Sequence, residues 1–136
     1  MRFSIINIFI SSLLLLACIG SLSAQTLDIR INGFKNQKGA VQIGIFKDQK
    51  SFEDDTPFIK KCISKSKIKN GELKTIIELS QGIYGIAILD DENENCKMDY
   101  SFFIPDEGIG FSQYEHSGLK RPRFKNFSFQ INNQEV

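Results

Sequence analysis

"GIYGIAIL", residues 82–89, reads as one strand at the centre of a sheet. The run has no charged residue and is apolar on both alternating sets of positions: Tyr84, Ile86 and Ile88 on one, Ala87 and Leu89 on the other. Because successive side chains of a strand point to opposite faces, such a run is typical of a strand that is covered on both sides. We therefore expect residues 82–89 to form a central strand.

Shorter strand patterns lie on both sides of this run. "TLDIRINGF" (26–34) and "GAVQIGIF" (39–46) alternate apolar with polar or small residues, which predicts a first hairpin with "KNQKG" (35–39) as its turn. "DQKSFEDDTPF" (48–58) is polar and predicts a loop or one short helical turn, with Phe52 and Phe58 packed against the core.

"FIKKCISKSKIKNG" (58–71) follows no strict period. Its β-branched residues and its closing Asn-Gly favour a strand that runs into "ELKTIIEL" (72–79), and a short helix is the alternative. Residues 90–123 read mostly as loop, and "RFKNFSFQI" (123–131) closes the chain as a strand. We predict an all-β fold, a single antiparallel sandwich of six or seven strands with one long loop rich in Asp, Asn and Gly.

The N-terminus has the layout of a secretory signal peptide. Arg2 precedes the uncharged run "IINIFISSLLLLACIG", and "SLSAQ" offers a cleavage point between Ala24 and Gln25. We therefore predict that residues 1–24 are removed, that 25–136 form one domain, and that the protein is exported as a periplasmic, outer-surface or secreted protein. A retained membrane helix and lipidation at Cys18, within "LLAC", are the less favoured alternatives.

Charge and cysteine content limit the partners. Arg2 is the only charged residue before Gln25, so its removal takes the formal net charge from +1 to zero. A neutral chain lacks the basic excess that drives binding to phosphate backbones, which argues against nucleic acid. Two cysteines remain, Cys62 and Cys96, and they form either one disulfide or two unpaired thiols.

The stretch "DDENENCKMDY" (90–100) has the ligand spacing of an EF-hand-like calcium loop. With Asp91 as position one, the odd positions to nine are Asp91, Asn93, Asn95, Lys97 and Asp99. In such a loop positions one, three and five give side-chain oxygens, seven gives a backbone carbonyl, and nine often acts through water. Lys97 is compatible, because only its carbonyl would be used.

Two positions depart from the full pattern. Position six, usually glycine, is Cys96, and position twelve, usually a bidentate glutamate, is Phe102. A replacement carboxylate would come from Asp90, Asp106 or Glu107. We therefore predict weak calcium binding, with a Kd on the order of 10⁻⁴–10⁻³ M. The alternative is an Asx-rich loop that is held by its own hydrogen bonds and binds no metal.

The residue patterns that would indicate catalysis are weaker than the calcium-loop spacing. Ser112 and His116 with Asp106 would suit a nucleophilic triad, but no strained elbow motif surrounds the serine. The adjacent carboxylates Asp106 and Glu107 would suit glycoside hydrolysis, but neighbouring loop residues do not set the required separation.

The chain resembles a known bacterial family. The carrying residues are "GIYGIAILDDENENCKMDYSFFIPDEGIGFSQ" followed by "RPRFKNFSFQI", together with the opening "LDIRINGFKNQKGAVQIGIF". They are similar, in order and spacing, to the bacterial domain-of-unknown-function family 2141, except that Cys96 stands where that family usually has glycine. The resemblance implies an exported sandwich of the transthyretin or carboxypeptidase-regulatory-like type, and it implies no known activity.

Three classes of function follow. The favoured one is an exported non-catalytic binding or accessory module with a calcium loop at 91–99 and an unknown protein or glycan partner at the cell envelope. The second is a metal-independent module that binds a glycan or protein through the loop aromatics Tyr100, Phe102, Phe103 and Tyr114. A hydrolase built on Asp106, Glu107 or His116 is the least favoured, because no catalytic motif supports it.

Overall fold

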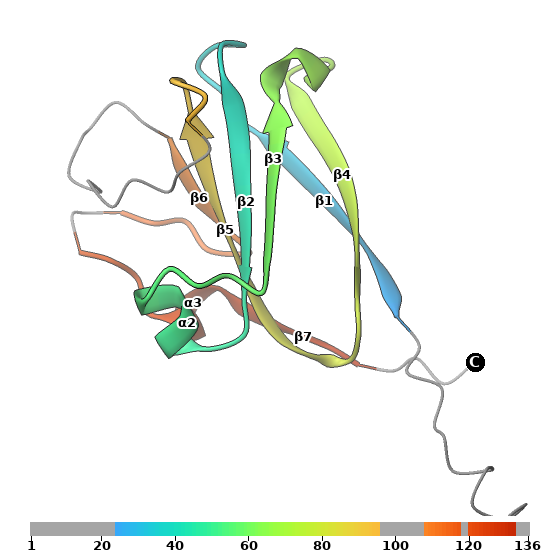
Figure 1. Cartoon of the computed structure of the whole chain (residues 1–136), viewed down its shortest axis with the longest axis vertical. Helices are drawn as coiled ribbons and strands as arrows, with labels where there is room; N and C mark the ends of the chain where they lie inside the picture. Colours follow the sequence, from blue (N-terminus) through green and yellow to red (C-terminus); the bar gives the residue numbers. More distant parts are fainter. Residues whose placement is uncertain (1–23, 96–107, 118–119, 133–136) are drawn as a thin grey trace, which may run out of the picture.

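Two antiparallel sheets form a sandwich in the computed structural model, which describes residues 24–95, 108–117 and 120–132 (Figure 1). Along the chain the elements are β1 (Gln25–Asn32), β2 (Ala40–Phe46), α2 (Gln49–Glu53), β3 (Ile59–Ser64), the 3₁₀ helix η2 (Lys65–Lys67), β4 (Glu72–Leu79), β5 (Gly82–Asp91), β6 (Ile109–Phe111), α3 (Phe124–Phe127) and β7 (Ser128–Ile131). The predicted all-β sandwich is confirmed, with seven strands among the described residues.

Strand β5 is central, as its sequence predicts. One of its edges pairs with β2, and the other pairs with β6 at Ala87–Leu89 and with β7 at Gly82–Gly85. Strand β3 completes this sheet on the far side of β2. The second sheet has two strands, β1 and β4, and crosses over the first (Figure 1).

The predicted hairpin of residues 26–34 with 39–46 is wrong. β1 pairs with β4, from Gln25 opposite Leu79 to Asn32 opposite Glu72, and the connection after β1 carries the chain into the other sheet. The reason lies in burial: β1 is buried on one face only, whereas every residue of β2 is buried. A strand covered on both faces belongs beside β5, and the polar Gln42 within β2 concealed this in the sequence.

The predicted turn at Asn70-Gly71 is present, and both residues have positive φ, 52° and 77°. This is the backbone that a tight Asn-Gly turn requires. The turn closes a bridge between Lys69 and Glu72, but β3 and β4 do not pair with each other across it. The three residues of η2 redirect the chain from one sheet to the other.

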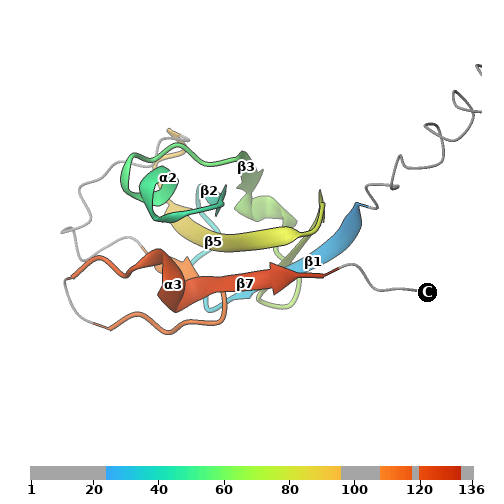
Figure 2. The same ribbon diagram turned by 90° about the horizontal axis from the view of Figure 1, so that it is seen from below.

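Apolar side chains fill both faces of the β2–β5 layer. Between the sheets lie buried residues of β1 to β5 and β7, among them Ile29, Ile31, Val41, Ile43, Ile45, Leu73, Tyr84 and Ile86. On the opposite face α2 and α3 lie next to each other (Figure 2) and close a second cluster of Phe46, Phe52, Ala87, Phe124 and Phe127. This two-sided cover explains why β5 is apolar at both sets of alternating positions.

The segment before β3 follows the prediction in part. The expected helical turn is α2, where the Asp48 carboxylate accepts the Ser51 N–H at 2.7 Å. Hydrogen bonds from the backbone and side chain of Ser51 lower the pKa of Asp48. Phe52 is buried as predicted. The prediction for Phe58 holds in part: its ring centre lies 6.3 Å from that of the buried Tyr84, but its side chain is 52% exposed and also meets Lys47 Nζ, 3.4 Å from the ring centre.

The closing segment is strand only from Ser128. Phe124 and Phe127 instead lie on α3, where a spacing of three residues puts both rings on the side that faces β5. Gly85 of β5 lies directly beneath them: a Cβ there would stand 2.5 Å from Phe127 Cε2 and 2.8 Å from Phe124 Cε2. The helix can approach the sheet this closely because residue 85 has no side chain.

We predict that Gly85→Ala lowers the free energy of unfolding by about 1–3 kcal/mol, because the added methyl group overpacks this contact. Gly110→Ala is the matched control, since its Cβ would meet no described atom closer than Ile88 Cβ at 3.8 Å. Urea unfolding followed by circular dichroism measures both variants. Equal stability of the two variants would contradict the packing described here.

Candidate functional site

The most unusual polar residues of the fold stand at the end of β5. Asp90 and Asp91 are both buried, with 8% and 1% of their surface exposed, just before the chain enters the long loop. As adjacent residues of a strand they point to opposite faces of the sheet. Asp90 therefore faces the space between the two sheets, and Asp91 lies on the side of Gln42, away from β1 and β4.

Asp90 forms an ion pair with Lys65, which is the first residue of η2 and is completely buried. The Lys65 Nζ atom also lies 3.4 Å from Asn36 Oδ1 and 5.9 Å from the centre of the Phe34 ring. The Lys65 backbone N–H donates to Gly39 O at 3.0 Å. Lys65 thus joins η2, the end of β5 and the crossover after β1.

A buried ion pair is a poor source of stability. Removing both charges from water costs several kcal/mol per ion, and an apolar pair of similar volume is often as stable or more so. Losing one partner is different, because the other charge is then left buried and uncompensated. We therefore expect the Lys65–Asp90 pair to specify how these three segments meet rather than to add much free energy.

Asp91 has a partner on the other face. Its Oδ2 accepts a hydrogen bond from Gln42 Nε2 at 3.2 Å, and both side chains are buried. The Oε1 atom of Gln42 has no hydrogen-bond partner among the described residues. Asp91, the first predicted calcium ligand, thus takes part in holding the strand end in place.

Gly39 lets the crossover lie against this strand end. Its φ is +83°, and a Cβ at this position would stand 2.2 Å from Asp91 O and 2.7 Å from Glu92 Cα. Only glycine satisfies both conditions. Asn36 adds a second link, because its Nδ2 donates to Glu92 Oε1 at 2.8 Å.

The described part of the predicted calcium loop is tightly wound. Asn93 Oδ1 accepts the backbone N–H of Asn95 at 3.0 Å, and Glu94 between them has a φ of +58°. This Asx turn fits both a metal loop and a loop held by its own hydrogen bonds. At the base, the Asp90 N–H donates to Gly108 O at 2.8 Å and ties the two ends of the long loop together.

Of the predicted ligands, the structure places Asp91 in the sheet and Asn93 and Asn95 on the exposed turn that follows it. The remaining two, Lys97 and Asp99, lie outside the described residues, as do Asp106 and Glu107. Within the described ranges, no group of three or more His, Cys, Asp or Glu side chains stands close enough to hold a metal ion. Calcium binding at 91–99 therefore stays a prediction.

Ser112 has a structural role. Its Oγ accepts the Ile86 N–H at 2.9 Å and donates to Phe127 O, so the hydroxyl links β5 to the end of α3. The ring of His116 packs 5.7 Å from that of Phe111. The third member of the suggested triad, Asp106, lies outside the described residues.

The loop aromatics are described only at Tyr114, since Tyr100, Phe102 and Phe103 lie outside the described ranges. Tyr114 is half-buried and packs its ring 6.4 Å from that of Phe111, at the margin of the second apolar cluster.

Cys62, in β3, is disulfide-bonded. It stands opposite Gln42 in the register, so it shares the face on which Asp91 lies. The sequence left open whether Cys62 and Cys96 form one disulfide or stay unpaired; Cys96, like Cys18, is outside the described residues.

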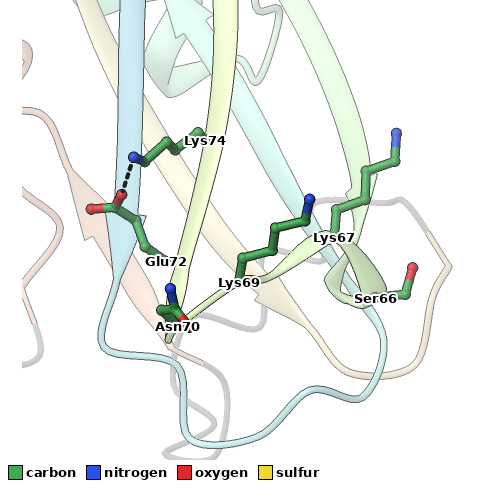
Figure 3. A pocket seen from close by; sticks show the side chains of 6 residues that line it. All are labelled: Ser66, Lys67, Lys69, Asn70, Glu72 and Lys74. Atoms are coloured by element: carbon green, nitrogen blue, oxygen red, sulfur yellow. Dashed lines mark ion pairs between the residues drawn. The ribbon is translucent and has the colours of Figure 1, made fainter.

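A basic pocket, which the sequence did not predict, lies beside the exposed residues of η2. Ser66, Lys67, Lys69, Asn70, Glu72 and Lys74 line this basic pocket, which has a volume of 770 Å³ (Figure 3). The signal was visible as "KKCISKSKIKNGELK" (60–74), six lysines against one glutamate, but the near-neutral charge of the whole chain hid it. Within this stretch Lys65 turns inward, whereas Lys67 and Lys69 stay exposed.

A second group of cations surrounds Arg121, near α3. Lys120, Arg121, Arg123 and Lys125 line a smaller hollow of 390 Å³ together with Tyr114 and His116. Arg121 is already engaged, because it donates to the carbonyls of Phe52 and Glu53 at the end of α2 and lies over the Phe52 ring. Burial lowers the pKa of Arg121, and the nearby carboxylate of Asp55 opposes that shift.

Comparison with known families agrees with the resemblance in the sequence. The family described as "Uncharacterized protein conserved in bacteria (DUF2141)" matches residues 29–136, and the chain belongs to this family. No curated protein and no solved structure matches the chain. Across the described ranges, no helix has the length and apolar character needed to span a membrane.

We predict that Lys65→Met lowers the free energy of unfolding by about 3–5 kcal/mol, because Asp90 is then buried without a counter-ion. The double variant Lys65→Met/Asp90→Leu should recover most of this loss, since neither charge remains. Lys50→Met, which breaks the exposed pair with Asp54, is the control and should change stability little. The midpoint of denaturant unfolding is measured for each variant. A double variant as unstable as Lys65→Met would contradict the view that the loss comes from an unpaired buried charge.

Proposed function

We propose that this member of the DUF2141 family is an exported, non-catalytic binding or accessory module of the cell envelope. Export is supported by the apolar N-terminal run and its cleavage point before Gln25. The observation that carries the binding role is the buried Lys65–Asp90 pair at the base of the long loop. A charged pair in this position adds specificity of arrangement rather than stability, as expected where a loop must be presented in one orientation.

The hydrogen bonds of Ser112 argue against this residue as a nucleophile. A serine nucleophile needs a base that takes its proton, but the Ser112 hydroxyl donates to a backbone carbonyl instead. The hydroxyl is therefore committed to holding β5 and α3 together. This supports a binding module over a hydrolase that uses Ser112 as its nucleophile.

Calcium is the ligand that we propose for the loop at 91–99. The alternate Asp and Asn residues supply the oxygen donors that a hard cation needs, and the Asx turn at Asn93 winds the chain tightly. Calcium would draw Asp91, Asn93, Asn95, the Lys97 carbonyl and Asp99 together and order the loop above the fixed strand end. The alternative is a metal-independent surface in which the loop aromatics contact a glycan or protein.

We predict that the chain from Gln25 to Val136 binds calcium with a Kd on the order of 10⁻⁴–10⁻³ M, measured by calorimetric titration. Asn93→Ala/Asp99→Asn should abolish the heat of binding. Asp91 is a poor choice for this test, because its loss also removes the hydrogen bond from Gln42 inside the fold.

Glu94→Gln is the matched control. Glu94 lies in the same turn and is exposed, but position four of an EF-hand-like loop supplies no ligand. The control should therefore bind calcium as the wild type does. If the wild type gives no heat at millimolar calcium, or if Glu94→Gln loses binding as the double variant does, the calcium loop is refuted and the metal-independent module becomes the better account.

A further inference from the structure

We propose that the basic pocket binds a phosphorylated saccharide, with its phosphate group held between Lys67 and Lys69. This inference goes beyond the calcium loop, because the basic pocket lies on the other side of η2 and uses none of the predicted calcium ligands. Either proposal can fail without the other.

The charge of the basic pocket is unbalanced. Three ammonium groups and one carboxylate line it, and Glu72 is already paired with Lys74 at 3.1 Å (Figure 3). Lys67 and Lys69 have no ion-pair partner among the residues that the structure describes. The pocket thus offers two uncompensated positive charges to an incoming anion.

These two lysines stand on a well-fixed stretch of backbone. The Ser66 N–H donates to Ser64 Oγ and the Ile68 N–H to Lys65 O, while Lys69 and Glu72 exchange backbone hydrogen bonds of 2.9 and 3.0 Å. The buried Lys65 ties the same turn to the core. Figure 3 shows the side chains of Lys67 and Lys69 extending in the same direction from this backbone. Little backbone ordering remains for a ligand to impose, which favours affinity.

The chemistry of the lining suits a phosphate. A lysine ammonium is a compact point charge that several phosphate oxygens can approach, and lysine is a common phosphate ligand in proteins. All three cations of the basic pocket are lysines. A phosphomonoester carries nearly two negative charges at neutral pH, equal to the two that Lys67 and Lys69 leave uncompensated.

The rest of the lining selects the group that carries the phosphate. Ser66 and Asn70 offer neutral donors and acceptors of the kind that sugar hydroxyls require. A volume of 770 Å³ is far larger than one phosphate ion and lies within the range of small-molecule sites. Every lining residue is polar, so no aliphatic or aromatic residue lines the pocket to hold the acyl chains of a phospholipid.

The test is an NMR titration of the chain from Gln25 to Val136 with glucose 1-phosphate, in the presence of a calcium chelator. The chelator keeps the result independent of the calcium loop. Saturable shifts confined to the amides of residues 66–74 are expected. Glucose, which lacks the phosphate, and inorganic phosphate, which lacks the sugar, should each bind more weakly.

Lys67→Gln/Lys69→Gln should lower the affinity for glucose 1-phosphate at least about tenfold, since both charge-assisted hydrogen bonds to the phosphate are lost. Lys120→Gln/Lys125→Gln removes the same charge from the second cationic group and should leave the affinity unchanged. Equal losses in the two double variants would mean unspecific attraction and would overturn the proposal.

Three other results would overturn it as well. The first is the absence of shifts at millimolar glucose 1-phosphate. The second is inorganic phosphate binding as tightly as the sugar phosphate, which leaves the saccharide without a role. The third is sedimentation with phosphatidylglycerol vesicles that depends on Lys67 and Lys69 while glucose 1-phosphate fails to bind, which would assign the pocket to a lipid headgroup.

Discussion

The ion pair between Lys65 and Asp90 is the contact on which the functional end of this protein depends. It joins the 3₁₀ turn η2, the last residues of the central strand β5 and the crossover from β1 to β2. On one side of this junction the long loop leaves β5, and on the other η2 supplies Ser66 and Lys67 to the basic pocket. Both proposed ligand sites therefore rest on one buried charge pair.

The connectivity of the sandwich creates that junction. Because β1 pairs with β4 rather than with β2, the chain crosses between the sheets three times, at residues 33–39, at η2 and at residues 80–81. The first two crossings lie at the end of the sandwich where β5 also ends, since Ala40 stands opposite both Ser64 and Asp91. Crossings expose backbone polar groups that a hairpin would pair. Here Lys65, Asn36 and Gly39 hold the crossing segments together through hydrogen bonds. The backbone at residue 39 can lie against Asp91 and Glu92 because this residue is glycine.

The sequence predicted the fold class, the central strand and the family, because each of these depends on a local pattern. A run that is apolar at every position, as in 82–89, has few places to lie other than the middle of a sheet. Strand pairing was harder, since it depends on which strands are covered on both faces, and the buried Gln42 made β2 look half-exposed. Lys65 could not be singled out: it reads as one lysine among six, and its burial depends on a carboxylate that lies far along the chain. The ligand spacing at 91–99 was visible, whereas the commitment of Asp91 to Gln42 was not.

Amide hydrogen exchange in Lys65→Met/Asp90→Leu tests most directly whether the pair fixes geometry rather than supplying stability. The Lys65 N–H, bonded to Gly39 O, and the Asp90 N–H, bonded to Gly108 O, report on the junction, and the Ile43 and Ile45 amides report on the core. Our account predicts that the two junction amides exchange much faster than in the wild type, while the core amides keep their protection. Junction amides as protected as in the wild type would show that apolar side chains hold these segments equally well, and would contradict the role assigned to Lys65 and Asp90.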